Sequence, residues 1–313
     1  MKKTTTALAF ILFFVTTASR AQHKFEAIYS DVSLFWSAFD QLHRAKTTED
    51  SIAILQSAYL TKASPGVAQF TQGRIVSAKY LQKTISKHRQ YYTFLRSHTY
   101  KLDQILPRLD KHYKRLKKLY PETDIPKVYF VMGALNSAGT IKQDPIIGVD
   151  MFGFYPETPK QELSPWLLSV LRPIENIDIV VMHEMVHMLQ KGYEGQENTL
   201  LKKSIGEGGA DFVSELVTKS NINKHVHKYG IEHERELWML FKNEMHGTDL
   251  SNWLYNGLTS KDRPGDLGYF MGYKICEAYY KKAKDKKQAI KEILDIKDYG
   301  VFLAKSGYAT KFN

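Results

Sequence analysis

The sequence has almost no cysteine, because Cys276 is the only one in 313 residues. One cysteine excludes an intramolecular disulfide, and its apolar neighbours predict a buried thiol. After the N-terminus, no apolar run reaches the roughly 20 residues that a membrane-spanning helix needs. Internal repeats, low-complexity linkers and nucleic-acid-binding motifs are also missing. The sequence therefore gives no reason to expect a repeat architecture, a transmembrane segment or a nucleic-acid partner.

The N-terminus carries the features of an export signal. Lys2 and Lys3 precede an unbroken apolar run from Leu8 to Val15, which is too short to cross a membrane. Ser19-Arg20-Ala21 then places small residues at both positions that determine cleavage. We predict a Sec signal peptide over residues 1–21, a mature start at Gln22, and a periplasmic or secreted protein. No cysteine lies near the cleavage site, so a lipid anchor is not expected.

Acidic residues are outnumbered, with 33 Asp and Glu against 44 Lys and Arg and a net charge of +11. Without Lys2, Lys3 and Arg20, the mature chain keeps about +8 (11 − 3). Basic residues concentrate in 108–118 and 281–291, where apolar residues recur at helical spacing. This pattern predicts solvated helix faces, and the alternative is contact with anionic lipids of the envelope or with an acidic substrate.

The pattern of apolar residues predicts an α+β fold that is mostly helical. Apolar residues at spacings of three and four predict helices over Val32–Leu42, Ser51–Tyr59, Val67–Leu81 and Tyr91–Leu119. Lys127–Gly133 and Ile146–Val149 are short strand candidates joined by a turn at residues 136–140. From Pro165 onward the chain is again helical. We divide the mature chain into an N-terminal helical region at 22–120 and a second domain at 121–313.

The most informative motif is His183-Glu184-Met185-Val186-His187. Two histidines four residues apart lie on one face of a helix, where both imidazoles can reach one ion. The surrounding residues from Ile177 to Leu189 are apolar, so the helix is expected to be buried on all sides. The alternative is an ordinary pair of core histidines. Burial of two histidines and a glutamate costs several kcal/mol unless a metal or charge compensates, and we therefore predict a zinc site.

A second acidic motif follows 20 positions later at Glu207, with Asp211 four residues further on. On one helix face, Glu207 can bind the metal while Asp211 accepts the free ring N–H of a ligand histidine. Gly206, Gly208 and Gly209 are poor helix formers, and we expect them where this helix closely approaches the helix of the histidines. The alternative is a flexible loop with solvated carboxylates.

Together these motifs resemble the gluzincins, the thermolysin and aminopeptidase branch of the zincin metallopeptidases. The resemblance implies a zincin-like core in 121–313, with His183, His187 and Glu207 as Zn²⁺ ligands, Glu184 as general base and Asp211 behind the ligands. It also implies Tyr269 as oxyanion donor, with Tyr273 as the fallback. A strand edge is expected above the metal, supplied by one of the two predicted strands. Gly206 stands where that branch often has asparagine.

Residues 128–273 also resemble a family of uncharacterised bacterial proteins described as predicted zinc-dependent proteases, some with relatives linked to gliding motility. The resulting expectation is a secreted or periplasmic zinc metallopeptidase, a hydrolase that acts on peptide or protein substrates, with endopeptidase action favoured. The alternative is a non-catalytic cell-envelope assembly or peptide-binding protein on a peptidase scaffold. A third option is hydrolysis of a non-peptide bond. The intact Glu184 favours an enzyme, because a scaffold needs no base.

Overall fold

The computed structural model describes residues 26–125, 127–193, 197–257 and 259–312. The predicted signal peptide at residues 1–21 and the predicted mature start at Gln22 lie outside the described residues. No helix in these ranges combines the length and apolar character that a membrane span requires. The one cysteine, Cys276, is buried, as the sequence predicts.

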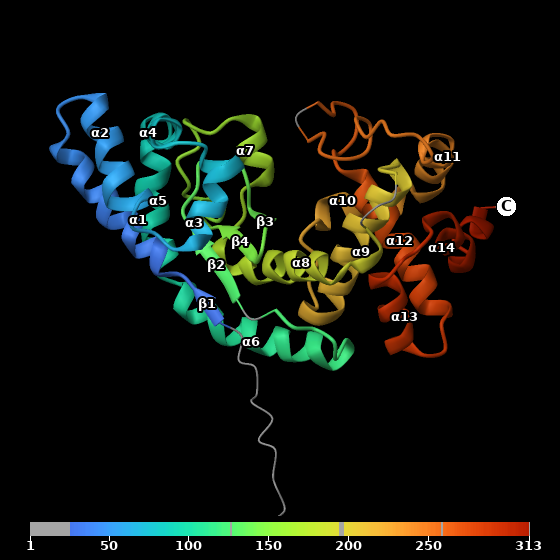
Figure 1. Cartoon of the computed structure of the whole chain (residues 1–313). Helices are drawn as coiled ribbons and strands as arrows, with labels where there is room; N and C mark the ends of the chain where they lie inside the picture. The colour runs from blue at the N-terminus through green and yellow to red at the C-terminus, as the bar shows by residue number, and fades with distance from the viewer. Residues whose placement is uncertain (1–25, 126, 194–196, 258, 313) are drawn as a thin grey trace, which may run out of the picture.

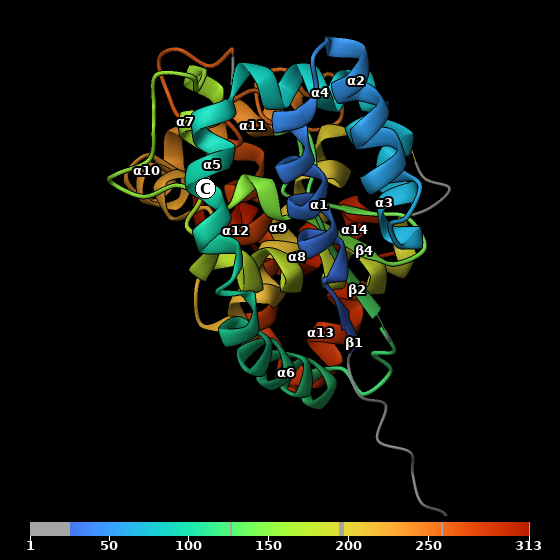
Figure 2. The same ribbon diagram turned by 90° about the vertical axis from the view of Figure 1, so that its left-hand side faces the viewer.

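The described chain consists mostly of helices, with one small sheet (Figures 1 and 2). The helices are α1 (Ser30–Gln41), α2 (Thr48–Ile54), α3 (Pro65–Phe70), α4 (Ala78–Lys87), α5 (Arg89–Thr99), α6 (Leu102–Leu119), α7 (Pro165–Val170), α8 (Ile177–Leu189), α9 (Leu200–Thr218), α10 (Lys224–Glu232), α11 (Glu234–Glu244), α12 (Leu267–Lys282), α13 (Lys286–Leu294) and α14 (Tyr299–Ser306). The strands are β1 (Glu26–Ile28), β2 (Lys127–Val131), β3 (Gly139–Ile141) and β4 (Pro145–Gly148). The predicted α+β, predominantly helical fold class is confirmed.

The sheet has the strand order β1-β2-β4-β3. β2 is parallel to both β1 and β4, whereas β3 runs antiparallel to β4. β4 is buried along its whole length and β2 everywhere except at Lys127, as expected for central strands with apolar sequences. β3 lies at an edge of this sheet and is half-exposed.

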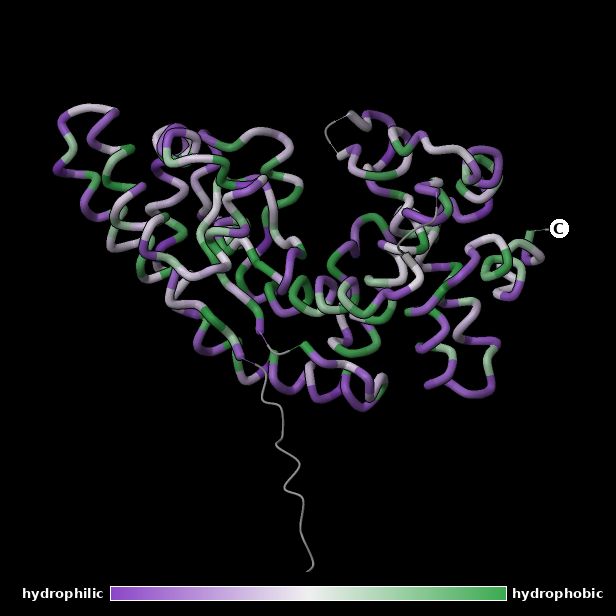
Figure 3. The backbone as a smooth tube through the Cα atoms, in the orientation of Figure 1, coloured by the Kyte–Doolittle hydropathy of each residue, from purple (hydrophilic) through white to green (hydrophobic). Residues whose placement is uncertain are grey.

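Helix α8 lies between the sheet and the C-terminal helices. It contacts β3 and β4 on one side and α9 on the other, and α6 packs below it in the view of Figure 1. The hydropathy colouring of Figure 3 shows apolar residues along α8 and along the neighbouring strand β2. One continuous apolar core joins residues from Val32 in α1 to Phe312 near the C-terminus. The division at residue 120 stays a prediction, although β1 from the first segment pairs with β2 from the second.

Two expected helices are each interrupted in the structure. The range Val67–Leu81 divides into α3 and α4, because a π-turn at Thr71–Ile75 contains non-helical Gly73 and leads to Val76 at φ 64°. Ser77 then caps α4 by accepting the backbone N–H of Tyr80. The range 91–119 divides into α5 and α6 at Tyr100 and Lys101.

Close backbone approach occurs at α9, but against a different helix from the one expected. A Cβ on Gly208 would lie 2.1 Å from the backbone nitrogen of Tyr273, and one on Gly272 would lie 1.7 Å from the carbonyl oxygen of Ser204. The glycines therefore allow α9 and α12 to cross in contact, whereas the prediction placed this contact at α8.

Candidate metal centre

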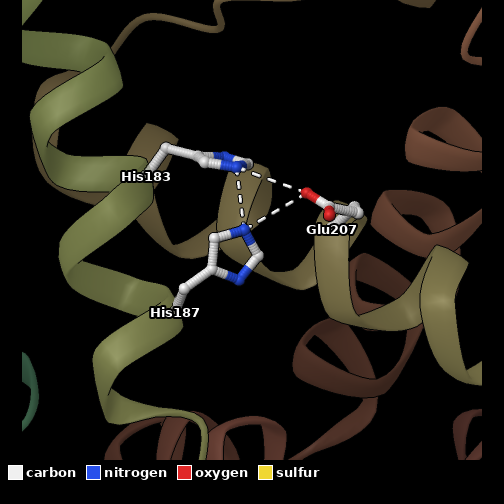
Figure 4. A group of neighbouring side chains, drawn as sticks. All are labelled: His183, His187 and Glu207. Carbon is white, nitrogen blue, oxygen red and sulfur yellow. Dashed lines mark hydrogen bonds and ion pairs between the residues drawn. The ribbon is translucent and has the colours of Figure 1, made fainter. Parts of the chain in front are cut away.

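Apart from Asp178, which pairs with Arg108 and His112 of α6, the polar residues of α8 gather on one side of an otherwise buried helix. Its apolar residues are almost entirely inaccessible, whereas His183, Glu184 and His187 are each half-buried. α9 runs past this side of α8 and presents Glu207 to the two histidines (Figure 4). The structure thus brings together the two motifs that the sequence separates by 20 residues.

Three candidate ligand atoms converge on one point. The Nε2 atoms of His183 and His187 are 3.0 Å apart, and Glu207 Oε2 lies 3.4 Å from the first and 3.2 Å from the second. Across the described residues, this is the one group of three whose ligand atoms lie within 4.8 Å of one another. Two histidines and a carboxylate are the ligand types of catalytic zinc sites, in which a fourth position stays open.

Each histidine is oriented by a hydrogen bond at its other ring nitrogen, Nδ1. His183 Nδ1 lies 2.9 Å from Asp211 Oδ1, whose second oxygen accepts a hydrogen bond from Asn223. His187 Nδ1 lies 2.8 Å from Gln190 Oε1, and Gln190 in turn donates to the carbonyl of Gly206 on α9. Both oxygens are acceptors, so both imidazoles must carry their proton on Nδ1. The predicted contact of Asp211 is present, and the sequence argument missed Gln190 and Asn223.

This proton arrangement fits a metal ion. With Nδ1 protonated, each neutral ring directs a lone pair from Nε2 toward the shared point, where a carboxylate oxygen also lies. Two lone pairs at this separation repel each other unless a cation lies between them. Burial disfavours a charged His183, but its hydrogen bonds to Asp211 and Glu207 outweigh burial and raise its pKa well above the ordinary value. Burial alone would raise the pKa of Glu207, but the two histidines hold it well below the usual range. The electrostatics of the cluster therefore favour an anionic carboxylate beside positive charge.

Glu184 lies against the edge strand. Its carboxylate has no hydrogen bond or ion pair within the described chain, and burial raises its pKa although His183 and His187 oppose this. A Cβ on Gly139 of β3 would lie only 2.5 Å from Glu184 Oε1, so a larger residue there would displace the Glu184 carboxylate. β3 is therefore the strand edge next to the metal site. The sequence argument assigned this edge to one of the two longer strands and interpreted residues 136–140 as a turn, which is wrong because both longer strands are interior.

The two tyrosines considered as oxyanion donors occupy different places. Tyr269, on the first turn of α12, stacks near His183 with ring centroids 6.3 Å apart. Tyr273 instead contacts Phe212 and His227, one turn further along α12. The structure therefore places Tyr269 beside the candidate metal centre and Tyr273 outside it. Burial raises the pKa of Tyr269 well above its ordinary value, so its hydroxyl remains a hydrogen-bond donor.

Tyr255 is a third tyrosine at the site, and the sequence argument missed it. Its hydroxyl donates to Glu207 Oε1 at 2.7 Å, and its backbone has a φ of 58° in the loop before α12. A positive φ is uncommon for an aromatic residue and occurs mostly at functional sites. No sequence pattern around Tyr255 indicates this position.

Three further histidines, on α10 or directly after it, occupy different environments. His225 lines a cavity next to His183. His227 packs against Phe270 and Tyr273, and His233 stacks on Tyr229 at 4.0 Å between ring centroids. None of them belongs to the candidate metal cluster.

The fold and this cluster define a mostly helical protein with a candidate metal centre between two packed helices. The sequence model of one protein family, described as gliding motility protein GldB, matches residues 18–310. The chain therefore belongs to the GldB family of gliding motility proteins. No curated protein and no solved structure matches the chain.

This membership corrects one expectation and confirms another in part. The chain was expected to belong among the metalloproteases, and that classification is wrong, because the matching family is described by gliding motility and not by proteolysis. The expected resemblance to proteins linked with gliding motility is confirmed at the level of the family.

Proposed function

We propose that the protein is an exported, envelope-associated component of a gliding-motility system that binds Zn²⁺ through His183, His187 and Glu207. Family membership supports the motility assignment. The convergence of three ligand atoms within 4.8 Å supports the metal site. The matched Nδ1 partners, Asp211 and Gln190, add a second reason to expect neutral imidazole ligands.

In this proposal the exposed side of the centre holds an extended peptide segment of a substrate or partner protein. β3 is an edge strand, and Gly139 of β3 lies directly against Glu184 beside the cluster. An extended peptide can add to such an edge by main-chain hydrogen bonds. The single observation that carries the proposal is this adjacency of a complete ligand set and an unpaired strand edge.

Cleavage of the bound peptide is a second candidate function, which the position of Glu184 favours. When bound, zinc would act as a Lewis acid and lower the pKa of its bound water. Glu184 has a carboxylate without an internal partner, next to the ligand histidines, and can accept a proton and pass it to a leaving amine. Tyr269 lies on the His183 side and supplies a hydroxyl for a developing oxyanion.

A comparison of the wild type with Glu184→Gln separates the two functions. Zinc-loaded proteins are incubated with a library of extended peptides, with binding measured by fluorescence anisotropy and fragments by mass spectrometry. A binding protein retains peptides in both forms and releases no fragments. An enzyme produces fragments only with Glu184, while the variant keeps its zinc and its peptide.

The absence of peptide binding by the zinc-loaded wild type would refute the peptide-binding proposal. Fragments produced equally by the Glu184→Gln variant would refute the role of Glu184 as base. A Glu207→Ala variant serves as the control in which the metal ligand set is incomplete.

A further inference from the structure

A cavity of about 470 Å³ opens directly beside the candidate metal centre. His183 and Tyr269 form part of its wall, so the cavity and the metal centre share a boundary. Residues from the end of α7, from the start of α10 and the loop before it, and from Gly257 and the segment 260–266 form much of the remaining wall. A group bound next to the metal can therefore extend a side chain or chain end into this space.

Arg172 contributes one fixed positive charge to the cavity. Its Nη1 donates to the carbonyl oxygens of Ser169 and Leu171, and its own backbone is anchored to Met151 and Phe154. Burial lowers the pKa of Arg172, and no carboxylate raises it. The carbonyl oxygens accept hydrogen bonds from part of the guanidinium group but do not neutralise its positive charge. An uncompensated charge at a half-buried position costs free energy.

Arg263 contributes a second charge from the opposite chain segment. Its Nη2 donates to the carbonyl of Asn252, and its guanidinium carbon lies 4.6 Å from the centre of the Trp253 ring. This stacking orders a side chain that would otherwise be mobile. Among the described residues, no ion pair includes Arg172 or Arg263.

Negative charge in the cavity wall is limited to Asp266. Its carboxylate accepts the backbone N–H of Asn256, and burial raises its pKa. His225 also lines the cavity, where burial and the nearby Arg172 lower its pKa. Among the described residues, the wall thus presents two permanent cations against one carboxylate, beside a centre that would itself carry a dication.

We propose that this cavity is a carboxylate pocket, in which Arg172 and Arg263 select acidic peptides for the metal centre. The group recognised is a carboxylate, from an acidic side chain or from a free C-terminus. Arginine suits this task because its planar guanidinium binds carboxylates through paired hydrogen bonds. The inference rests on the proposed peptide-binding function and specifies the class of peptide.

The first experiment tests the pocket without a peptide and without the metal. N-acetylglutamate and its uncharged diamide analogue, the α-amide of N-acetylglutamine, are titrated into the chelator-treated full chain, with binding followed by NMR. We expect the acid to bind at least about tenfold more tightly than the amide, the factor that 1.4 kcal/mol of binding free energy represents. We expect Arg172→Ala and Arg263→Ala each to remove most of this preference. Arg235→Ala, at an exposed position on α11, should leave it unchanged.

The second experiment uses the zinc-loaded full chain and three matched hexapeptides. One is capped and neutral, one is capped with a single internal glutamate, and one is neutral with a free C-terminal carboxylate. Tighter binding of the second assigns the pocket to an acidic side chain, and tighter binding of the third assigns it to a chain end. Either preference should be lost in Arg172→Ala and Arg263→Ala, with zinc content unchanged.

The outcomes separate this inference from the peptide-binding proposal. Equal binding of all three peptides by the wild type would overturn the carboxylate pocket and leave peptide binding intact. Binding of N-acetylglutamate that depends on the two arginines, with no peptide bound, would refute peptide binding and support the pocket. Binding of N-acetylglutamate unaffected by either substitution, or weaker than that of inorganic phosphate, would also overturn the inference.

Discussion

The metal centre and the cavity beside it are built in different ways. The candidate metal ligands come from two buried helices, α8 and α9, which hold residues four apart on one face. The cavity is built mainly from loops and helix ends, including Asp266 at φ 62°. Regular helix spacing thus places the candidate ligand atoms together, whereas irregular segments shape the cavity beside them.

The largest expected effect is on the helix packing that supports the metal centre. In Gly208→Ala, the new Cβ would lie 2.1 Å from the backbone of α12, which cannot move aside as a side chain would. We expect the free energy of unfolding to fall by about 3 kcal/mol or more, measured by denaturant titration. The matched control is Gly209→Ala on the same helix, whose nearest neighbour, Cys276 Sγ, is 3.4 Å away. Alanine has a better helix propensity than glycine, which should offset any destabilisation from this contact. Equal losses of stability in Gly208→Ala and Gly209→Ala would contradict the account.

A second prediction concerns Asp150, which fixes the loop leading to β3. The Asp150 carboxylate accepts the backbone N–H groups of Gly133 and Leu135, and Leu135 has a φ of 54°. Burial raises the pKa of Asp150 from 3.8 to about 6, so between these pH values the folded protein binds a proton that the unfolded chain releases. The contribution of Asp150 to stability should therefore decline as pH rises from about 4 to 6, by up to about 3 kcal/mol.

Comparison of the wild type with Asp150→Asn isolates this contribution, because the variant has no proton to release. Denaturant titrations at several pH values should show a less negative slope of stability against pH for the variant. Parallel slopes for the two proteins would show that Asp150 is ionised throughout this range.

The smallest expected effect is on zinc affinity when Gln190, which orients the His187 ring through Nδ1, is replaced. Gln190→Ala removes the acceptor of the His187 Nδ1–H and also a link to Gly206. Loss of such a partner typically weakens metal binding by about 10- to 100-fold. Competition with a zinc-binding dye measures the change, and Gln104→Ala on the exposed face of α6 is the control. Unchanged affinity in Gln190→Ala would mean that α8 alone orients the ring.

The same contrast explains what could be predicted from the sequence. His183, His187, Glu207 and Asp211 are related by spacings within helices, and local geometry alone places them on common faces. The helical character of the chain and its two longer strands follow from apolar periodicity in the same way. In each case the signal lies within a few neighbouring residues.

The remainder depends on contacts between distant segments. Tyr255 lies 48 residues from Glu207, to which its hydroxyl donates, and no short pattern indicates this contact. Arg172 and Arg263 likewise line one cavity although 91 residues (263 − 172) separate them. β3 is three residues long and begins at a glycine, so its two β-branched residues, Thr140 and Ile141, are too few to show an alternation. The helix break at Gly73–Val76 likewise depends on an unusual φ at a valine, which its intrinsic preference disfavours.

The most direct test of the metal centre is the zinc content of the purified protein, measured by plasma mass spectrometry beside a Glu207→Ala variant. The account predicts about one zinc ion per chain in the wild type, as expected for one three-ligand site, and a marked loss in the variant. A wild type that binds no zinc after reconstitution, or a variant that binds as much as the wild type, would contradict it.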